Sequence, residues 1–173
     1  MTDIEIHLAN LNDAQTSTTY RHLLNAYALD PMGGGQSIPT ERLERVAKDL
    51  REIPHARVYF ALINQQAIGF ATCFTGYSTF QARPLINIHD IAVLAEHRGK
   101  GIARALLKKI ARDAIQEGLC KITLEVREDN TIADALYRSE GFTAADFNGL
   151  EVQYLFLEKT LSAEKTTPRK SGA

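Results

Sequence analysis

The sequence is poor in the features that mark several classes of protein. It has only two cysteines, Cys73 and Cys120, which lie in apolar segments and form neither a CxxC pair nor a Cys/His cluster with metal-ligand spacing. We therefore expect buried free thiols and no metal site. No segment approaches the roughly 18 consecutive apolar residues that span a bilayer, and residues 1–7 lack the basic and then apolar pattern of a signal peptide. These absences predict a cytoplasmic protein that does not enter a membrane.

The charge of the chain is nearly balanced. Its 20 basic and 21 acidic residues give a formal net charge of −1, which creates no overall field for nucleic acid or an anionic membrane. Any anion site must therefore be local. A length of 173 residues with 45% hydrophobic and 24% charged residues is typical of one globular domain. We expect that domain at 1–161, and a flexible tail at 162–173, where Lys, Thr, Pro, Gly and Ser predominate.

Hydrophobic periodicity predicts an α/β (α+β) fold with the element order β-α-α-β-β-β-α-β-α-β-β. Period-2 or apolar segments bounded by turn residues predict strands at 4–9, 57–63, 67–74, 85–94, 121–127, 142–146 and 152–159. Apolar residues at helical spacing, with capping residues near the start, predict helices at 13–29, 40–52, 101–117 and 131–139.

A glycine-containing loop joins the strand that ends near Leu94 to the helix at 101–117. Gly99 and Gly101 permit a tight turn and a close approach of an anion to the backbone, and a helix start leaves up to four amides unpaired. A diphosphate suits such a loop. Neither GxxxxGK[ST] nor GxGxxG with a later acidic residue is present, so two common nucleotide-binding motifs are excluded. The alternative is an ordinary helix start with two turn glycines.

Two segments carry a family resemblance. Arg98-x-x-Gly101-x-Ala103 resembles the [Q/R]-x-x-G-x-[G/A] signature of the GCN5-related N-acetyltransferase (GNAT) superfamily, with alanine in place of the last glycine. The segment from Asn130 to Phe142 resembles its second cofactor motif, N-x-x-A-x-x-L-Y-x-x-x-G-F. The resemblance implies a mixed, mostly antiparallel sheet of six to seven strands, splayed between strands 4 and 5 and flanked by about four helices. It also implies an N-acyltransferase that moves an acetyl group from acetyl-CoA to a primary amine.

The resemblance assigns cofactor roles to specific positions. The diphosphate of coenzyme A would bind Arg98, Gly99, Lys100, Gly101, Ile102 and Ala103. The pantetheine arm would pair with the backbone of Ile91, Ala92 and Val93. Asn130 would contact this arm, although a helix N-cap is an equally physical role for it. Tyr137 would give a proton to the departing thiolate; the alternative is a tyrosine that only packs beside Leu136.

The reaction also needs a base, because an alkylamine with a pKa near 10.4 is almost entirely protonated at pH 7. His89 and Asp90 are ionisable residues within an apolar strand, and period-2 alternation places them on opposite faces unless a bulge intervenes. His89 titrates nearest neutrality and resembles a strand histidine of the serotonin N-acetyltransferases. Asp90 is the second candidate, and Glu125, acting through a water, is the third. The alternative for His89 is a structural histidine satisfied by hydrogen bonds.

The sequence gives little information about the identity of the acceptor. The resemblance implies a groove lined by the first two helices and the glycine-rich segment 28–35 between them. Residues 77–80 resemble a segment of the polyamine and thialysine acetyltransferases, which favours a small free amine, although the glutamate of those enzymes is His89 here. Acetylation of a protein N-terminus or lysine, and a non-catalytic acyl-CoA-binding module, stay open as alternatives. Relatives are often dimers, so a homodimer is also open.

Overall fold

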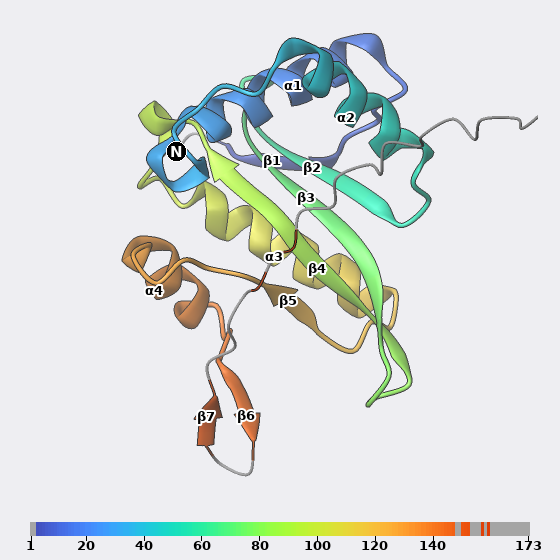
Figure 1. The fold of residues 1–173 in the computed structure, drawn as a ribbon, viewed down its shortest axis with the longest axis vertical. Coiled ribbons are helices and arrows are strands. Elements are labelled where there is room, and N and C mark those ends of the chain that lie inside the picture. The colour runs from blue at the N-terminus through green and yellow to red at the C-terminus, as the bar shows by residue number, and fades with distance from the viewer. Residues whose placement is uncertain (1–2, 148–149, 153–156, 158, 160–173) are drawn as a thin grey trace, which may run out of the picture. The chain divides into compact units, whose positions relative to one another are not determined.

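The computed structural model describes residues 3–147, 150–152, 157 and 159. The chain divides into two compact units, Met1–Gly141 and Phe142–Ala173. The first contains a sheet with its helices, and the second contains a short hairpin (Figure 1). The tail that we expect at 162–173 lies outside the described residues.

The four predicted helices are present within one residue of their expected bounds. They are α1 (Ala14–Leu29), α2 (Thr40–Glu52), α3 (Ile102–Gln116) and α4 (Thr131–Ser139), with the short 3-10 helices η1 (Pro31–Gly33) and η2 (Ala95–His97) between them. Side chains fix two of the helix starts, because Asp13 accepts a hydrogen bond from the amide of Thr16 and Asn130 accepts one from the amide of Ala133. Among the described helices, none combines the length and apolar character that crossing a bilayer requires.

Within the described residues, the main sheet has five strands rather than the expected six to seven. These are β1 (Glu5–Leu8), β2 (Ala56–Ile63), β3 (Gln66–Ser78), β4 (Arg83–Val93) and β5 (Ile122–Leu124), in spatial order β1-β2-β3-β4-β5. The first four are antiparallel to their neighbours and β5 runs parallel to β4, so the sheet is mixed.

The described residues that follow α4 contain a separate pair of short strands. β6 (Ala145–Phe147) and β7 (Leu150–Val152) make a two-stranded antiparallel sheet in the second unit. Their bounds differ from the predicted 142–146 and 152–159, and most of the latter range lies outside the described residues. Alternation predicts that a segment is extended, but it does not specify which strand edge the segment joins.

β4 and β5 separate after a short stretch of pairing. Ile86–Ile88 pairs with Ile122–Leu124, whereas β4 continues to Val93 with pairing only to β3. The expected splay between the fourth and fifth strands is therefore present. β5 is shorter than the predicted 121–127 because the residues after Leu124 are mostly charged and exposed.

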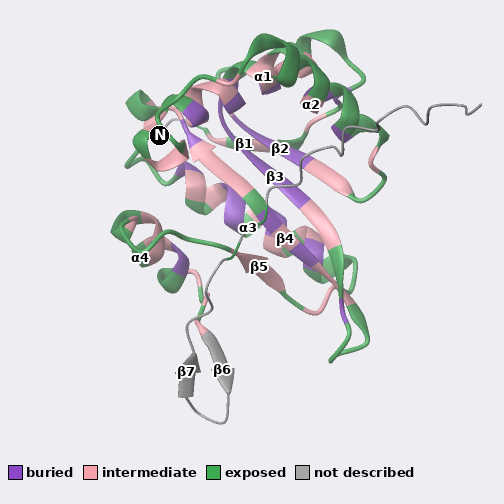
Figure 2. Cartoon of the chain, viewed as in Figure 1, coloured by how far each residue is buried: buried purple, intermediate pink, exposed green. Residues whose placement is uncertain are grey.

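Helices cover both faces of the sheet. In β2, Val58 and Phe60 belong to the core that packs under α1 and α2, while the intervening Tyr59 bonds to Asp113 of α3. Because successive strand residues point to opposite faces, α3 must lie opposite α1 and α2. Figure 1 shows α3 passing behind the central strands, and Figure 2 shows that buried residues concentrate along β2, β3 and β4.

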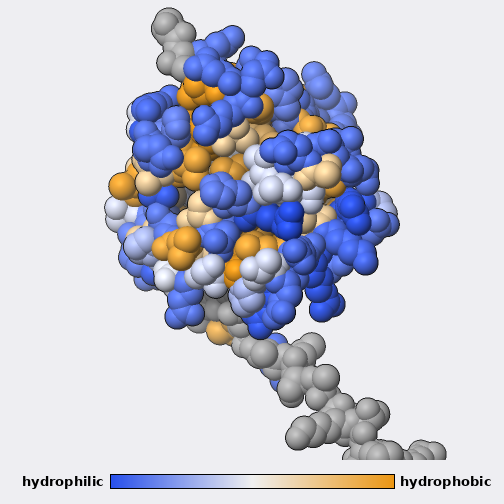
Figure 3. All heavy atoms as spheres, turned by 90° about the horizontal axis from the view of Figure 1, so that it is seen from above, coloured by the Kyte–Doolittle hydropathy of each residue, from blue (hydrophilic) through white to orange (hydrophobic). Residues whose placement is uncertain are grey.

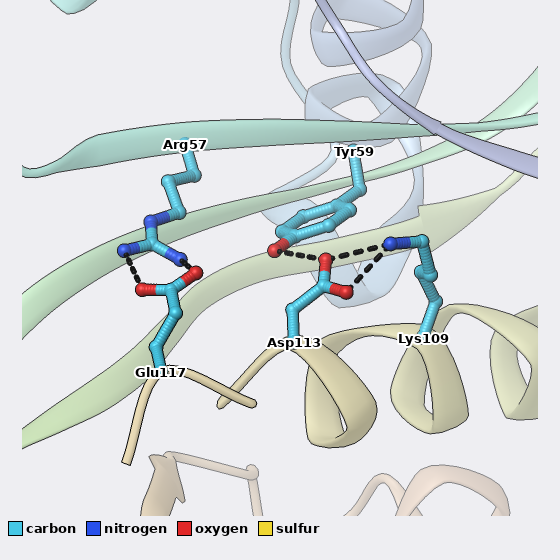
Figure 4. A network of polar contacts seen from close by, with 5 residues as sticks. All are labelled: Arg57, Tyr59, Lys109, Asp113 and Glu117. Carbon is cyan, nitrogen blue, oxygen red and sulfur yellow. Dashed lines mark hydrogen bonds and ion pairs between the residues drawn. The ribbon is translucent and has the colours of Figure 1, made fainter. Parts of the chain in front are cut away.

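Polar contacts attach α3 to β2 (Figure 4). The guanidinium of Arg57 makes a two-pronged contact with the carboxylate of Glu117, at 2.5 and 2.6 Å. The hydroxyl of Tyr59 donates to Asp113 at 3.0 Å, and Lys109 contacts the same carboxylate at 2.6 and 2.8 Å. This network fixes the helix whose N-terminus forms part of the candidate site.

The two cysteines differ in burial. Cys73 is fully buried in β3, and its burial raises the pKa of its thiol to about 12. Cys120 is only partly buried, so the expectation of two buried thiols is wrong for this residue. It lies in the short connection between α3 and β5, where little covers it. Both are free cysteines.

Candidate active site

The segment 98–103, here called the phosphate loop, has an open backbone. Gly99 and Gly101 have φ angles of +74° and +79°, and a Cβ built at either position meets no atom within 4 Å. In the described part of the chain, the amides of residues 99–104 donate to no protein acceptor, and the helix ladder begins with the bond from the Ala105 amide to the Gly101 carbonyl. The dipole of α3 adds partial positive charge there. This row of free amides fits a diphosphate. Ile102 contributes only its backbone, because its side chain is buried in the core.

Arg98 is held in place by two acceptors. Its Nε donates to the carbonyl of Val93 at 3.0 Å, and its Nη2 contacts Asp30 at 2.8 Å. A guanidinium has five N–H donors, so these contacts leave three for a ligand. Lys100 donates to the carbonyl of Glu96 at 2.9 Å.

Part of the positive charge on α3 is matched by the protein itself. Arg104 contacts Glu140 at 2.6 Å and Ser139 at 2.8 Å, both at the end of α4. Lys109 pairs with Asp113. An exogenous anion is therefore not required to balance these two cations, although the phosphate loop itself stays open.

A β-bulge changes the phase of β4 at the candidate base. Thr72 pairs with Asp90 and Cys73 pairs with Ile88, which leaves His89 without a partner on β3. The expectation that His89 and Asp90 face opposite sides is therefore wrong, because one extra residue in a strand shifts every following side chain to the other face.

Both side chains lie beside residues of the α1–α2 core. The His89 ring approaches Phe74 edge-on, with centroids 5.7 Å apart, and Phe74 packs against that core. Asp90 adjoins Thr72, whose hydroxyl bonds to that of Tyr20 at 3.0 Å. Burial raises the pKa of Asp90, and the neighbouring His89 and the Thr72 hydroxyl partly oppose this.

A polar pocket of about 120 Å³ lies where β4 and β5 separate. It collects most of the predicted chemical groups from three parts of the chain. Its lining consists of Tyr27, Met32, Ile88, His89, Ile91, Leu124, Glu125, Val126, Arg127, Asn130, Ala133 and Tyr137. His89 and Glu125 are therefore brought together with Tyr137, whereas Asp90 does not line this pocket.

Tyr137 is a nearly buried side chain, 8% exposed, in α4. Burial, with a smaller contribution from Tyr27, raises the pKa of its hydroxyl to about 12. The phenol therefore stays protonated at neutral pH and retains a proton to donate. Asn130 caps α4 through the Ala133 amide at 3.2 Å, so its structural role is present, and contact with a cofactor stays a prediction.

A larger, mainly apolar cavity of about 400 Å³ lies between α1 and the end of β4. It shares Tyr27 with the polar pocket and includes three predicted cofactor residues. Its lining consists of Leu23, Ala26, Tyr27, Leu29, Asp30, Pro31, Phe70, Ala92, Val93, Leu94, Ala95, Glu96 and Arg98. Together the two cavities follow β4 from the phosphate loop to His89. Seen from above, apolar surface is exposed among hydrophilic residues (Figure 3).

Sequence reasoning missed Tyr27, Asp30 and Arg127. Tyr27 is half-buried in α1, and burial, together with Asp90 and Asp30, raises the pKa of its hydroxyl. At its helical spacing it is indistinguishable from a core aromatic. Only the implied groove between the first two helices pointed toward this region.

Comparison with known proteins agrees with this architecture. Residues 20–142 match the acetyltransferase (GNAT) family. The chain belongs to this family, whose enzymes use acetyl-CoA.

Individual relatives are more distant. A segment of 74 residues is 35% identical to thialysine N-epsilon-acetyltransferase of Bos taurus and covers 43% of each protein. The chain spans about half the length of the curated relatives it matches. Among solved structures, a probable acetyltransferase has a TM-score of 0.75 at 19% identity, over 92% of this chain and 99% of that one. Aminoglycoside N-acetyltransferase AAC(6')-Iy in complex with CoA has a TM-score of 0.71 at 19% identity, over 93% and 97%. These structural likenesses establish the fold.

Proposed function

We propose that this protein is an N-acetyltransferase that transfers the acetyl group of acetyl-CoA to the primary amine of a small molecule. The observation that carries the proposal is the row of free amides at residues 99–104, which lies at one end of a path of two cavities. The path ends at a pocket that holds an imidazole, a carboxylate and a protonated phenol.

The residues along the path suit the parts of coenzyme A. The phosphate loop and the three spare N–H groups of Arg98 bind the diphosphate. The apolar cavity takes the pantetheine arm beside Ala92 and Val93, where β4 has no β5 partner. The polar pocket then places the thioester near Tyr137. When bound, acetyl-CoA supplies an activated acetyl group.

Two proton transfers remain for the side chains of the chain. His89 accepts the proton that the amine releases as the C–N bond forms, since it lines the pocket whereas Asp90 does not. Tyr137 donates its hydroxyl proton to the sulfur as the C–S bond breaks. Asp90 and Glu125 are the other candidates for the base.

Three features support a small amine as the acceptor. The polar pocket is only about 120 Å³. The carboxylate of Glu125 in its wall suits an ammonium group. The partial relative from Bos taurus is named for thialysine, which is an amine-bearing small molecule.

The test is to follow thiol release from acetyl-CoA over a panel of thialysine, lysine, polyamines, aminoglycosides and peptides. We expect turnover with at least one small amine and none with the peptides. Turnover with peptides alone would mean that the acceptor is a peptide or protein and not a small molecule. No turnover together with intact coenzyme A binding would indicate a non-catalytic binding module.

The base is tested separately. His89→Gln should flatten the acidic limb of the pH–rate profile. If that limb persists, the base is Asp90, Glu125 or a water that Glu125 holds.

A further inference from the structure

Asp30, at the end of α1, joins two loops through its two carboxylate oxygens. Its Oδ1 accepts a hydrogen bond from the amide of Met32 at 2.8 Å. Its Oδ2 contacts the Nη2 of Arg98, also at 2.8 Å. The Asp30 side chain is only 16% exposed, whereas that of Arg98 is 50% exposed. One carboxylate thus connects residues 30–35, here called the acceptor loop, to the phosphate loop.

The acceptor loop is organised around this one residue. Besides the side-chain cap, the Asp30 carbonyl accepts hydrogen bonds from the amides of Gly33 at 2.8 Å and Gly35 at 3.0 Å. Gly34 and Gly35 have positive φ angles and no atoms near an added Cβ, so little else packs against them. The Met32 amide, and then Arg98, lower the pKa of Asp30, which therefore stays ionised at neutral pH.

The same loop borders both cavities. Asp30 and Pro31 line the apolar cavity, and Met32 lines the polar pocket. Arg127 adds only a long contact of 3.5 Å to the Pro31 carbonyl. The position of the acceptor loop therefore shapes both cavities, and the Asp30 carboxylate ties this loop to the phosphate loop.

Arg98 can bind Asp30 and a diphosphate at the same time. Its contacts with Val93 and Asp30 use two of the five N–H donors, so a ligand need not displace the carboxylate. Immobilising a long side chain costs conformational entropy. Once one partner has fixed the side chain, the binding of a second partner costs less entropy. The anion and the carboxylate repel each other, so an anion on Arg98 strengthens the hold of Arg98 on Asp30 through this saving in entropy alone.

We propose that Asp30 is a positioning residue that couples the phosphate loop to the acceptor loop, so that coenzyme A bound at one orders the other. This rests on the proposed function only in taking coenzyme A as the ligand of the phosphate loop. Coenzyme A binding then prepares the walls of the polar pocket before the amine enters.

The test is hydrogen exchange at the amides of Gly33 and Gly35, with and without saturating coenzyme A, in the full-length chain. Asp30→Asn keeps an oxygen to cap Met32 but turns an N–H group toward Arg98, so it removes the coupling and leaves the cap. Asp49→Asn, which removes an exposed carboxylate paired with Arg45 in α2, is the matched control.

In the unmodified protein and in Asp49→Asn, coenzyme A should slow exchange at these glycines by at least about fivefold, the lower range of measured coupling. In Asp30→Asn it should still bind, as calorimetry on the same samples reports, but slow exchange by less than about twofold. Asp30→Ser, which also keeps a capping oxygen, provides the same comparison if the asparagine variant does not fold.

Two results would overturn the coupling. One is coenzyme A binding to the unmodified protein without slower exchange at the acceptor loop. The other is undiminished slowing in Asp30→Asn. A lack of coenzyme A binding to the unmodified protein is a different failure, because it refutes the proposed function itself.

Discussion

Tyr137 is the residue whose environment best fits a single chemical role. Tyr137 lines the polar pocket although it is only 8% exposed, and the raised pKa of about 12 keeps the hydroxyl proton in place throughout the usual assay range. Tyr137→Phe preserves the ring and removes the hydroxyl group that would donate the proton. We expect kcat to fall by about 10² or more, the range for general acid catalysis, with the KM for acetyl-CoA within about twofold. Steady-state thiol release measures both. A change confined to KM would mean that Tyr137 only binds the cofactor.

The ionised carboxylate of Asp90 lowers the stability of the folded protein by an amount that depends on pH. Burial raises its pKa in the folded state above the unfolded value of about 3.9, so folding favours the protonated form. The resulting stability is fully present below about pH 4 and is lost as the pH rises through the raised pKa. Asp90→Asn resembles the protonated form at every pH. Its Tm should exceed that of the unmodified protein at pH 8, by about 2–4 °C if the cost is about 1 kcal/mol.

The same comparison at pH 5 should show a smaller difference, and differential scanning calorimetry at both pH values measures it. Asp49→Asn, in the exposed face of α2, should show no such pH trend. Equal destabilisation of Asp90→Asn at both pH values would mean that the bond to Thr72 outweighs the burial of charge.

At the residue level, the sequence motifs and the ionisable residue types predicted the candidate site residues better than strand alternation predicted their orientation. His89, Glu125, Asn130 and Tyr137 were all expected near the reaction and do share one pocket. The phase of Asp90 was wrong, because a bulge depends on pairing between two strands and leaves no mark on one strand alone. Tyr27 and Asp30 were missed for a related reason: their importance comes from what α1 faces in space.

In the phosphate loop, the effect of a substitution on stability can be distinguished from its effect on coenzyme A binding. Gly101 has φ of +79°, and Gly118, just after α3, has φ of +72°; neither has atoms near an added Cβ. Alanine at either position carries the same left-handed strain, about 1–2 kcal/mol, and so a similar fall in Tm. Only Gly101→Ala should also weaken coenzyme A binding, because the added methyl group would lie beside the free amides that bind the diphosphate. Gly101→Glu should abolish binding by bulk and charge.

Isothermal calorimetry with coenzyme A on these variants and on Gly118→Ala measures the difference. Equal affinity in all of them would place the diphosphate elsewhere on the protein.

The ion pair between β2 and the end of α3 contributes to the stability of the fold, and this contribution can be measured. Arg57 lowers the pKa of Glu117, so the pair stabilises the fold above about pH 4.3, and this stability is lost as the pH falls through the lowered pKa. Glu117 is 44% exposed, which keeps the contribution in the range of surface pairs, about 0.2–1 kcal/mol.

Glu117→Gln should therefore lower the Tm at pH 7 by about 0.4–4 °C, with a difference that shrinks on acidification. Glu44→Gln, whose longer contact with Arg21 is 3.6 Å, is the control and should leave the Tm unchanged. A loss of Tm that persists at low pH would mean that packing of the Glu117 side chain, rather than its charge, matters.

Helices were predictable as elements because their period, caps and length are local properties, and all four lie within one residue of expectation. The strands of the central sheet were also found, since alternation and apolar runs mark them. The number of strands in the sheet was not, because β6 and β7 are extended in sequence terms but pair with each other. Edge pairing is decided by tertiary contacts that a single segment does not encode.

At the scale of the whole molecule, a net charge of −1 means that an anionic ligand gains nothing from long-range attraction. Binding must come from the local amides and from Arg98. A ligand at 100 times its Kd stabilises the folded state by about 2.7 kcal/mol. For a domain of this size we expect coenzyme A at that concentration to raise the Tm by about 5–10 °C.

Three comparisons test whether this thermal shift is specific to coenzyme A and the phosphate loop. ATP with magnesium at the same concentration should give little shift, because the chain has no GxxxxGK[ST] loop. Gly101→Glu should abolish the shift with coenzyme A. Raising the ionic strength from 0.05 to about 0.3 M should reduce it only slightly, since contacts to directed amides are screened less than long-range attraction. A shift that vanishes in salt, or that ATP reproduces, would mean that the protein attracts polyphosphates by general charge and not through the phosphate loop.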